Sequence, residues 1–523
     1  MYFCKSKIHK NKHIRNTNIC VKKIIFILLF STLSAITYSQ KLIEYQSGMG
    51  TRDAKKPDIW VLYDNVTASH DGMDLYADSA HYNTNLNDFT AFRNIKIVLT
   101  DTTFIYGDLL FYNGNTRVLE IFGKEVVFID GNTTLKTDHL QYDRNTNVAG
   151  YTNHAITTNK DNTIKSVKGY YHSGNKEFLF MDKVELSNNS SHVYTDTLKY
   201  NSQTNVALFE SYTRIISDST TIYSECGWYN TNTKKAHSSK ATKIISESNT
   251  LICDTLDYDE KNKITIGKMN VVMTDSVNDV ILLGNYAFSN EHLNYLFITD
   301  SATAIFIDNG DSLFLHSDTL FATTDKDNNF ETVKSYHNVK FFRQDIQGSC
   351  DSILYSVKDS LITMFYEPVI WHEENQFSAD TIVMELNAEG IKEIHLTSNS
   401  FISSKVDDSK FNQMYGKNAI IYFDGKNPLY CNIIGNAQSV YYLTEEDEAG
   451  NSSLLGVNVG IGSGIKIYFK NRKPTRIVTY DNPNMQTYPM KDFPEEKKTL
   501  KGFKWHSTKR PMNVKDIYKH ERK

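Results

Sequence analysis

Short runs of alternating apolar and polar residues follow one another along most of the chain, with Asn, Asp, Gly and Lys between them. Such alternation is typical of a half-buried β-strand, whereas an amphipathic helix repeats every 3.6 residues or so. No segment shows a convincing helical period. The clearest alternating runs are Asn94–Leu99, Glu125–Phe128, Lys183–Leu186, Asn338–Phe341 and Pro368–Trp371. The pattern therefore predicts an all-β fold.

A short motif recurs, and its first clear copy runs from Leu75 to Asn83, anchored on Asp78 and Tyr82. The anchor positions of twelve copies are Asp78, Asp108, Asp138, Val167, Asp196, Glu225, Asp254, Asn285, Asp318, Asp351, Asp380 and Asn418. A tyrosine follows four residues later in the clearest copies, namely Tyr82, Tyr112, Tyr142, Tyr200, Tyr258 and Tyr355. Most steps between anchors are 29–33 residues, which predicts a repeat array.

Apolar or small residues lie three and one positions before the anchor, and again two and four positions after it. In an unbroken strand these two sets would face opposite sides of the sheet. We therefore expect a bulge or sharp bend at the Asp, which turns both sets inward.

Strands with one apolar face need neighbours to bury it, so stacked copies should form two facing sheets around a long apolar interior. We expect alternate positions of the strands that follow each motif to line this interior, although each could instead fill a solid core. The candidates are Ile95, Ile97, Val126, Phe128, Val184, Leu186, Val339, Phe341, Val369 and Trp371.

Proline is rare in the chain, with 8 residues in total, and only Pro57 precedes Pro368. Because proline cannot donate a ladder hydrogen bond, this distribution favours one continuous sheet over linked domains. We expect repeats over 40–445, terminal strands with a Gly-rich turn over 446–480, and a Pro-containing basic tail over 481–523. This tail should be extended, with Phe503 and Trp505 as residues through which it could fold back.

The first 39 residues have the pattern of a signal peptide: seven Lys/Arg and no acid, then the apolar run Ile24–Phe30, then small residues before a cut after Ser39. A membrane anchor is the alternative, but the apolar run is short for a span. The sequence thus predicts export.

Without the signal the chain carries 50 Lys/Arg against 61 Asp/Glu, while residues 491–523 carry 11 against 5. An acidic body argues against nucleic acid as a partner. The basic tail could contact anionic lipid or an acidic protein, or remain solvated.

Candidate chemistry is sparse, and we predict no enzyme, no cofactor and no metal. His372-Glu373-Glu374 lacks the second His of a metalloprotease motif, and the glycines at 460–464 match no nucleotide-binding loop. Cys226, Cys253, Cys350 and Cys431 are widely spaced, without a CxxC pair, and are expected mainly as small buried residues whose disulfide state stays open. The Asp/Tyr pairs recur too often for a catalytic pair, so we interpret them as scaffold.

Asn65-Val66-Thr67 followed by Leu75-Tyr76-Ala77-Asp78-Ser79-Ala80-His81-Tyr82 resembles the signature of OstA-like (LptA-type) proteins, also found as the N-terminal part of LptD. Asp64 stands where the signature has Gly. The long chain resembles extended Bacteroidetes-type members. The resemblance implies an elongated periplasmic β-jellyroll, V-shaped or slightly open, which holds lipid A acyl chains of lipopolysaccharide without catalysis. It also implies partner jellyrolls, or further copies of this chain, joined by edge-strand addition, and an outer-membrane association.

Two other readings remain open. An LptD-like outer-membrane translocon would need many lipid-facing strands after residue 450, and few are evident. A secreted parallel β-helix, as an adhesin or a polysaccharide-acting protein, would pack a dry, filled core instead.

Overall fold

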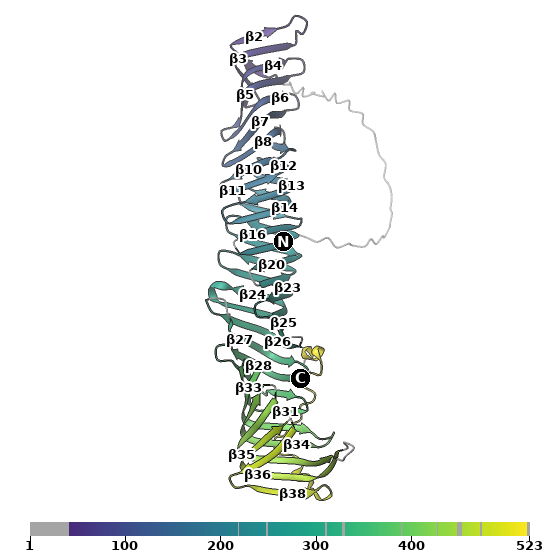
Figure 1. Cartoon of the computed structure of the whole chain (residues 1–523). Coiled ribbons are helices and arrows are strands. Elements are labelled where there is room, and N and C mark those ends of the chain that lie inside the picture. The colour runs from purple at the N-terminus through teal and green to yellow at the C-terminus, as the bar shows by residue number, and fades with distance from the viewer. Residues whose placement is uncertain are drawn as a thin grey trace, which may run out of the picture. The chain divides into compact units, whose positions relative to one another are not determined.

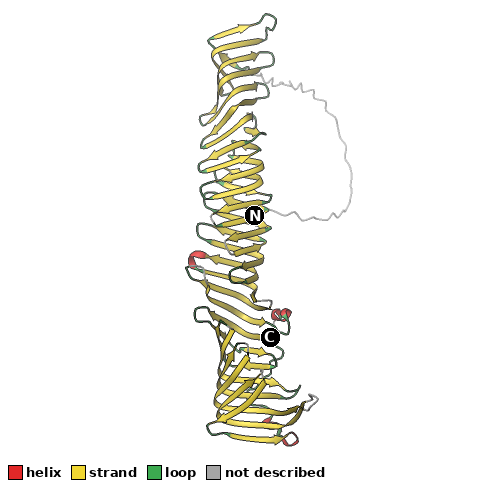
Figure 2. Ribbon diagram, viewed as in Figure 1, coloured by secondary structure: helices red, strands yellow, loops and turns green. Residues whose placement is uncertain are grey.

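The computed structural model describes residues 41–217, 219–246, 249–308, 311–326, 330–388, 390–425, 427–446, 452–470 and 473–519. The expected signal peptide at 1–39 lies outside these ranges. Residues 42–523 form one unit, and its described part contains 38 strands joined into one sheet, with four short 3-10 helices (Figure 2). The all-β prediction is confirmed.

The strands nearest the N-terminus are mostly long. They are β1 (Glu44–Gln46), β2 (Met49–Arg52), β3 (Ile59–His70), β4 (Met73–Asn83), β5 (Asp88–Thr100), β6 (Thr103–Asn113), β7 (Val118–Asp130) and β8 (Thr133–Asp143). Shorter strands dominate next: β9 (Val148–Tyr151), β10 (Ala155–Asn159), β11 (Asn162–Ser166), β12 (Lys168–His172), β13 (Glu177–Ser187), β14 (Ser191–Asn201), β15 (Val206–Phe209), β16 (Thr213–Ser217), β17 (Thr220–Ser224), β18 (Cys226–Asn230), β19 (Lys235–Lys240), β20 (Thr242–Ser246), β21 (Asn249–Cys253) and β22 (Thr255–Asp259).

The strands from β23 onward are again mostly long. They are β23 (Ile264–Asp275), β24 (Val280–Asn290), β25 (Tyr295–Asp308), β26 (Asp311–Thr324), β27 (Phe330–Phe342), β28 (Ile346–Ser356), β29 (Leu361–Phe365), β30 (Val369–His372), β31 (Asn375–Ser378), β32 (Thr381–Asn387), β33 (Gly390–Lys405), β34 (Phe411–Asp424), β35 (Asn427–Glu446), β36 (Ser452–Lys470), β37 (Lys473–Tyr480) and β38 (Asn484–Pro489). The 3-10 helices are η1 (Glu291–Leu293), η2 (Met490–Asp492), η3 (Glu495–Lys497) and η4 (Val514–Tyr518).

The strands stack in chain order, and every described pairing is antiparallel (Figure 1). The short strands reveal two ladders: β10, β11, β16, β17, β20 and β21 pair in one, and β9, β12, β15, β18, β19 and β22 in the other. We call these ladders wall A and wall B. Each long strand bends from one wall to the other. The antiparallel pairing rules out the parallel β-helix reading of the sequence.

The bends form where the repeat anchors lie. In β4 the buried positions shift from Leu75 and Ala77 to Ala80 and Tyr82, so the apolar phase slips at Asp78 as predicted. The left-handed backbone lies on the next strand, however, at Arg93 and Asn94 of β5. Residues 93–95 of β5 lie opposite only two residues of β4, 77 and 78, so β5 contains one extra residue, which is a β-bulge.

The anchor Asp stabilises this bulge through its side chain. The Asp78 carboxylate accepts a hydrogen bond from the Asn94 amide at 2.8 Å. The same pairing recurs in four more copies, as Asp138 with Asn153, Asp254 with Asn270, Asp318 with Asn338, and Asp380 with Asn399. Asp108 instead accepts from the backbone N–H of Lys124. These contacts support the interpretation of the Asp ladder as scaffold.

The chain after β37 adds an edge strand, β38, which pairs with β36. It then runs back along the sheet, where Phe503 contacts the rings of Phe401 and Phe411, and Trp505 contacts Phe411. Folding back through these two aromatic residues is thus observed.

Candidate functional site

Walls A and B bury their apolar faces against each other. One apolar cluster extends from Ile43 to Leu320, and a second from Val339 to Ile467. In β7 the Phe128 ring of wall A lies 6.0 Å from Tyr142 and 5.6 Å from Tyr171, both of wall B, measured between ring centroids. The motif tyrosines therefore help to fill the space between the walls.

Eight of the ten predicted lining residues belong to these two clusters. They are Ile95, Ile97, Val126, Phe128, Val184, Leu186, Val339 and Phe341. All eight are buried in a structure that contains no lipid, so their burial is compatible with a lining role and with a solid core.

Val369 and Trp371 are buried on the other face of wall A, which corrects their assignment to the interior. Ile370, between them, belongs to the interior cluster, and side chains alternate along a strand. Trp371 pairs with Gln347 and Gln376, and both of these glutamines bind the C-terminal tail. The apolar character of this strand thus serves tail packing on one of its faces.

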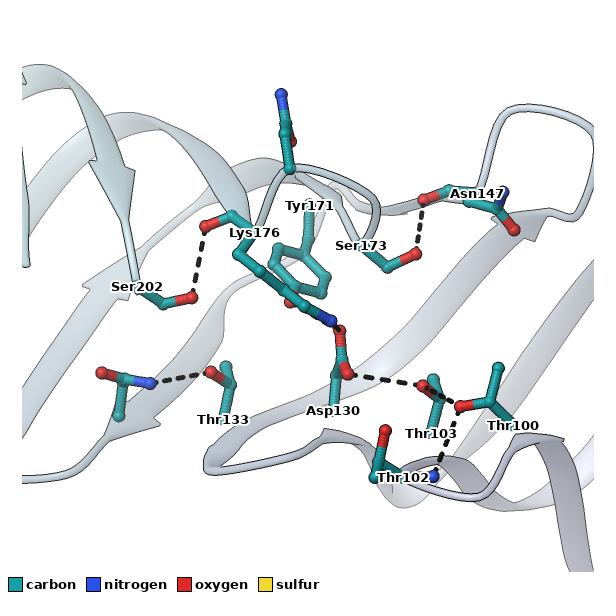
Figure 3. Close-up of polar contacts among 12 residues, drawn as sticks. Thr100, Thr102, Thr103, Asp130, Thr133, Asn147, Tyr171, Ser173, Lys176 and Ser202 are labelled. Carbon is teal, nitrogen blue, oxygen red and sulfur yellow. Dashed lines mark hydrogen bonds and ion pairs between the residues drawn. The ribbon is translucent and has the colours of Figure 1, made fainter. Parts of the chain in front are cut away.

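A row of polar contacts joins the turns of the two walls at the edge opposite the bends. Figure 3 shows one of them: the Asp130 carboxylate of wall A accepts hydrogen bonds from the Tyr171 hydroxyl and the Lys176 ammonium group of wall B, each at 2.6 Å. The side chain of Asp130 is 2% exposed and that of Lys176 is 37% exposed. A carboxylate this buried needs such partners, because an unpaired buried charge is strongly unfavourable.

Equivalent contacts lie before and after it along the sheet. Arg117 of wall B forms an ion pair with Asp71 of wall A, and the Lys234 ammonium group donates to Asn188 at 3.1 Å and to Ser190 at 2.7 Å. The cation follows its partner by 46 residues in the pairs Asp71–Arg117, Asp130–Lys176 and Asn188–Lys234. We call this row of cross-wall contacts the seam.

Buried tyrosine hydroxyls reinforce the seam. Tyr112 contacts His70 at 2.6 Å, Tyr229 contacts Ser191 at 2.7 Å, and Tyr200 accepts from Asn162 at 3.1 Å. Burial raises the pKa of each of these tyrosines and that of Tyr171, for which the hydrogen bond to Asp130 adds to the effect. Their hydroxyls therefore stay protonated to a higher pH than that of an ordinary tyrosine.

The seam ends where a cavity begins. A cavity of about 400 Å³ lies between the walls from β17 to β27, and Met273, Leu282 and Ile298 are among its lining residues. In β24 the consecutive residues Val280 to Leu283 are all half-buried, instead of alternating between buried and exposed. We call β3–β16 the closed section and β20–β25 the open section. A smaller cavity of about 50 Å³ lies near Met414 and Ile467.

The C-terminal tail covers the outer face of wall A in the last third of the sheet. The side-chain amide of Gln413 donates to the carbonyl of Lys498 and accepts from the N–H of Leu500, each at 2.8 Å. Gln376 makes the same pair of bonds to Lys504 and His506. Two glutamines thus hold the tail through its backbone.

Other candidate chemistry is modest in the described part of the chain. Glu385, Glu393 and His395 offer ligand atoms within 4.8 Å of one another, but Lys392 already pairs with Glu385 at 2.6 Å. The four cysteines among the described residues are free thiols; Cys253, Cys350 and Cys431 are buried, as expected, and burial raises the pKa of Cys253 to about 11. In the ranges that the structure covers, no helix has the length and apolar character needed to cross a membrane.

Sequence reasoning found the bends and the interior but missed the seam. Its signal was present in the chain as acidic or amide residues in wall A turns and basic residues 46 positions later. The spacing of 46 residues becomes interpretable only once the structure shows how the turns of the two walls are staggered.

The comparisons agree with this architecture. A profile of the family described as "OstA-like protein" matches residues 40–196 and 197–297. A second profile, "LptA/(LptD N-terminal domain) LPS transport protein", matches residues 309–390. The fold and these matches define a jellyroll protein of the lipopolysaccharide transport class.

The chain belongs to the OstA/LptA-like family. Members of this family are periplasmic, and the family is one of transport proteins, which gives the chain a role related to lipopolysaccharide transport. Among solved structures, LptH from Pseudomonas aeruginosa, described as the LptA-homologous periplasmic component of the lipopolysaccharide transport device, matches with 16% identity. The match covers 21% of this chain and 79% of LptH, with a TM-score of 0.18. No curated protein matches the chain.

Proposed function

We propose that this chain carries the acyl chains of lipopolysaccharide between walls A and B in the periplasm, while the sugar headgroup stays outside. The observation that carries the proposal is the apolar interior shared by both walls, which opens into a cavity in the open section. No catalytic step is needed for such a role.

The energetics favour a sheltered path. A buried CH₂ group is worth ~0.8 kcal/mol, so exposing a dodecanoyl-sized chain to water costs roughly 8–10 kcal/mol. An interior of uniform apolar character keeps successive positions of the lipid close in free energy. Energy supplied at one end can then move the cargo along.

The ends of the sheet offer joints for other jellyroll proteins or for further copies of this chain. In the described residues, β1 and β2 pair only with β3, and β37 pairs only with β36. Exposed edges of this kind accept a further strand from a partner. We propose that the chain stands in a periplasmic bridge, and that its far end meets the outer membrane.

Photocrosslinking tests the proposal. Photoactivatable residues at Ile97, Phe128 and Leu282 should capture lipopolysaccharide, whereas one at Lys96, which is exposed on the outer face of the same strand as Ile97, should not. Equal capture at Ile97 and Lys96 would contradict an internal path. Native mass spectrometry of the purified protein should show a co-purifying glycolipid.

A further inference from the structure

The closed section conflicts with a permanently open lipid path. Phe128 and Ile97 are fully buried, and the seam bridges the walls where a headgroup would have to protrude. If acyl chains enter this section, as the proposed function requires, then the seam contacts must break and the walls must part. This inference rests on that function and concerns how the seam regulates it.

The seam is asymmetric in charge. Its cations, Arg117, Arg144, Lys176 and Lys234, all lie on turns of wall B, whereas wall A supplies carboxylate, carbonyl, amide and hydroxyl oxygens. When the walls part, the wall B rim is therefore left with a row of cations. Phosphate groups are good ligands for such side chains, because charge-assisted hydrogen bonds are about twice as strong as neutral ones.

The row continues into the cavity. Lys263 occupies a wall B turn 29 residues after Lys234, which is one repeat, and it lines the cavity of the open section. Lys263 is half-buried and lines the same cavity as Met273 and Leu282. Lys263, which continues the row of wall B cations, thus already lines the space where the walls are apart.

We propose that Lys263, Lys234, Lys176 and Arg117 form successive sites for the anionic headgroup of a phosphorylated glycolipid, and that wall A oxygens hold the last three when no lipid is present. The headgroup enters at Lys263, where the walls are apart. It then replaces Asn188 and Ser190 at Lys234, and Asp130 at Lys176. Each replacement exchanges one anionic or polar partner for another, so the cation is never left unpaired.

The two partners of one contact should then have opposite effects. In Asp130→Asn the Lys176 cation remains, but the wall A group that competes with the headgroup for it binds more weakly. Capture of bis-phosphorylated lipid A by a photoactivatable phenylalanine analogue at Phe128 should therefore rise several-fold. In Lys176→Met the headgroup site is lost, so capture should fall several-fold, and Lys176→Arg should restore it. A purely structural role for the ion pair would move both variants in the same direction, which would overturn the proposal.

A covalent lock separates this inference from the proposed function. Asp130→Cys and Lys176→Cys, in a chain with Cys226→Ser, can be bridged by a short bismaleimide. The same protein treated with a monofunctional maleimide is the control, in which the loss of Lys176 lowers capture at Phe128 but does not abolish it. Bridging should abolish capture at Phe128 and leave capture at Leu282 unchanged. Undiminished capture at Phe128 in the bridged protein would refute the seam as a gate, whereas absent capture at both positions in the control would refute the proposed function itself. Dephosphorylated lipid A should be captured at Leu282 but only weakly at Phe128.

Discussion

The closed and open sections are built from the same repeat, yet they treat the space between their walls differently. In the closed section, the Phe128 ring of wall A meets Tyr171 of wall B, which stacks on Phe178 of its own wall. Every inward position of β8, from Thr133 to Tyr142, is buried. In the open section, inward positions carry small residues such as Gly267 and Ala287, and a cavity remains.

This difference shows which part of the repeat sets the width of the space between the walls. The backbone of both sections follows the same bulge and ladder rules, because the Asp–Asn contact at the bend recurs in both. Side-chain volume at the inward positions, together with the polar residues at the turns, decides whether the walls touch. One scaffold can thus form both a closed and an open section.

The sharpest test of the contrast is truncation of the interior. Phe128→Ala should destabilise the closed section by about 3–5 kcal/mol, because it leaves a cavity in a filled core. Leu282→Ala should cost about 1 kcal/mol, because this side chain is already half-buried beside a cavity. Hydrogen exchange of each section in increasing urea measures both losses, and equal losses would mean that the two interiors are packed alike.

The seam contact of Asp130 should contribute less to the free energy of unfolding than a core side chain does, but more than a surface ion pair. Asp130→Ala should cost about 2–3 kcal/mol, since it leaves the buried Tyr171 hydroxyl without its acceptor while Lys176 can turn to solvent. The matched control is Glu125→Gln, which removes an exposed pair with Lys136 and should cost under about 0.5 kcal/mol. Chemical denaturation measures the loss of unfolding free energy in both variants. Similar losses would mean that Asp130 behaves like a residue of an ordinary surface ion pair.

Alkaline pH should weaken the seam gradually. Because burial raises the pKa of Tyr112, Tyr171, Tyr200 and Tyr229 in the folded state, the unfolded chain loses these protons first. Stability is therefore fully present below about pH 10, the unfolded tyrosine value, and falls as the pH rises above it, by about 1.4 kcal/mol per tyrosine and pH unit. Tyr171→Phe should remove one tyrosine's share of this slope in denaturation measured from pH 9 to 11.

Much of the fold was accessible from the sequence because the anchors report local backbone geometry. The slip from Ala77 to Ala80 around Asp78 is a consequence of strand alternation, and it correctly predicted a bend. It could not show that the left-handed residues lie on the partner strand at Arg93 and Asn94, because that depends on register.

The interior was predicted less completely. Strand alternation groups Val369 with Trp371, but the sequence does not say which face meets the other wall, and a tail more than 100 residues away covers the face that carries Trp371. The seam was missed because it joins turns of different walls. Neither periodicity nor composition reports such a contact.

The way the tail is held has a consequence for its own sequence. Gln376 and Gln413 recognise a peptide carbonyl and a peptide N–H, which every residue except proline supplies. At these points the path of the C-terminal segment is encoded in the strands beneath it, and many different side chains could occupy the segment without loss of its course.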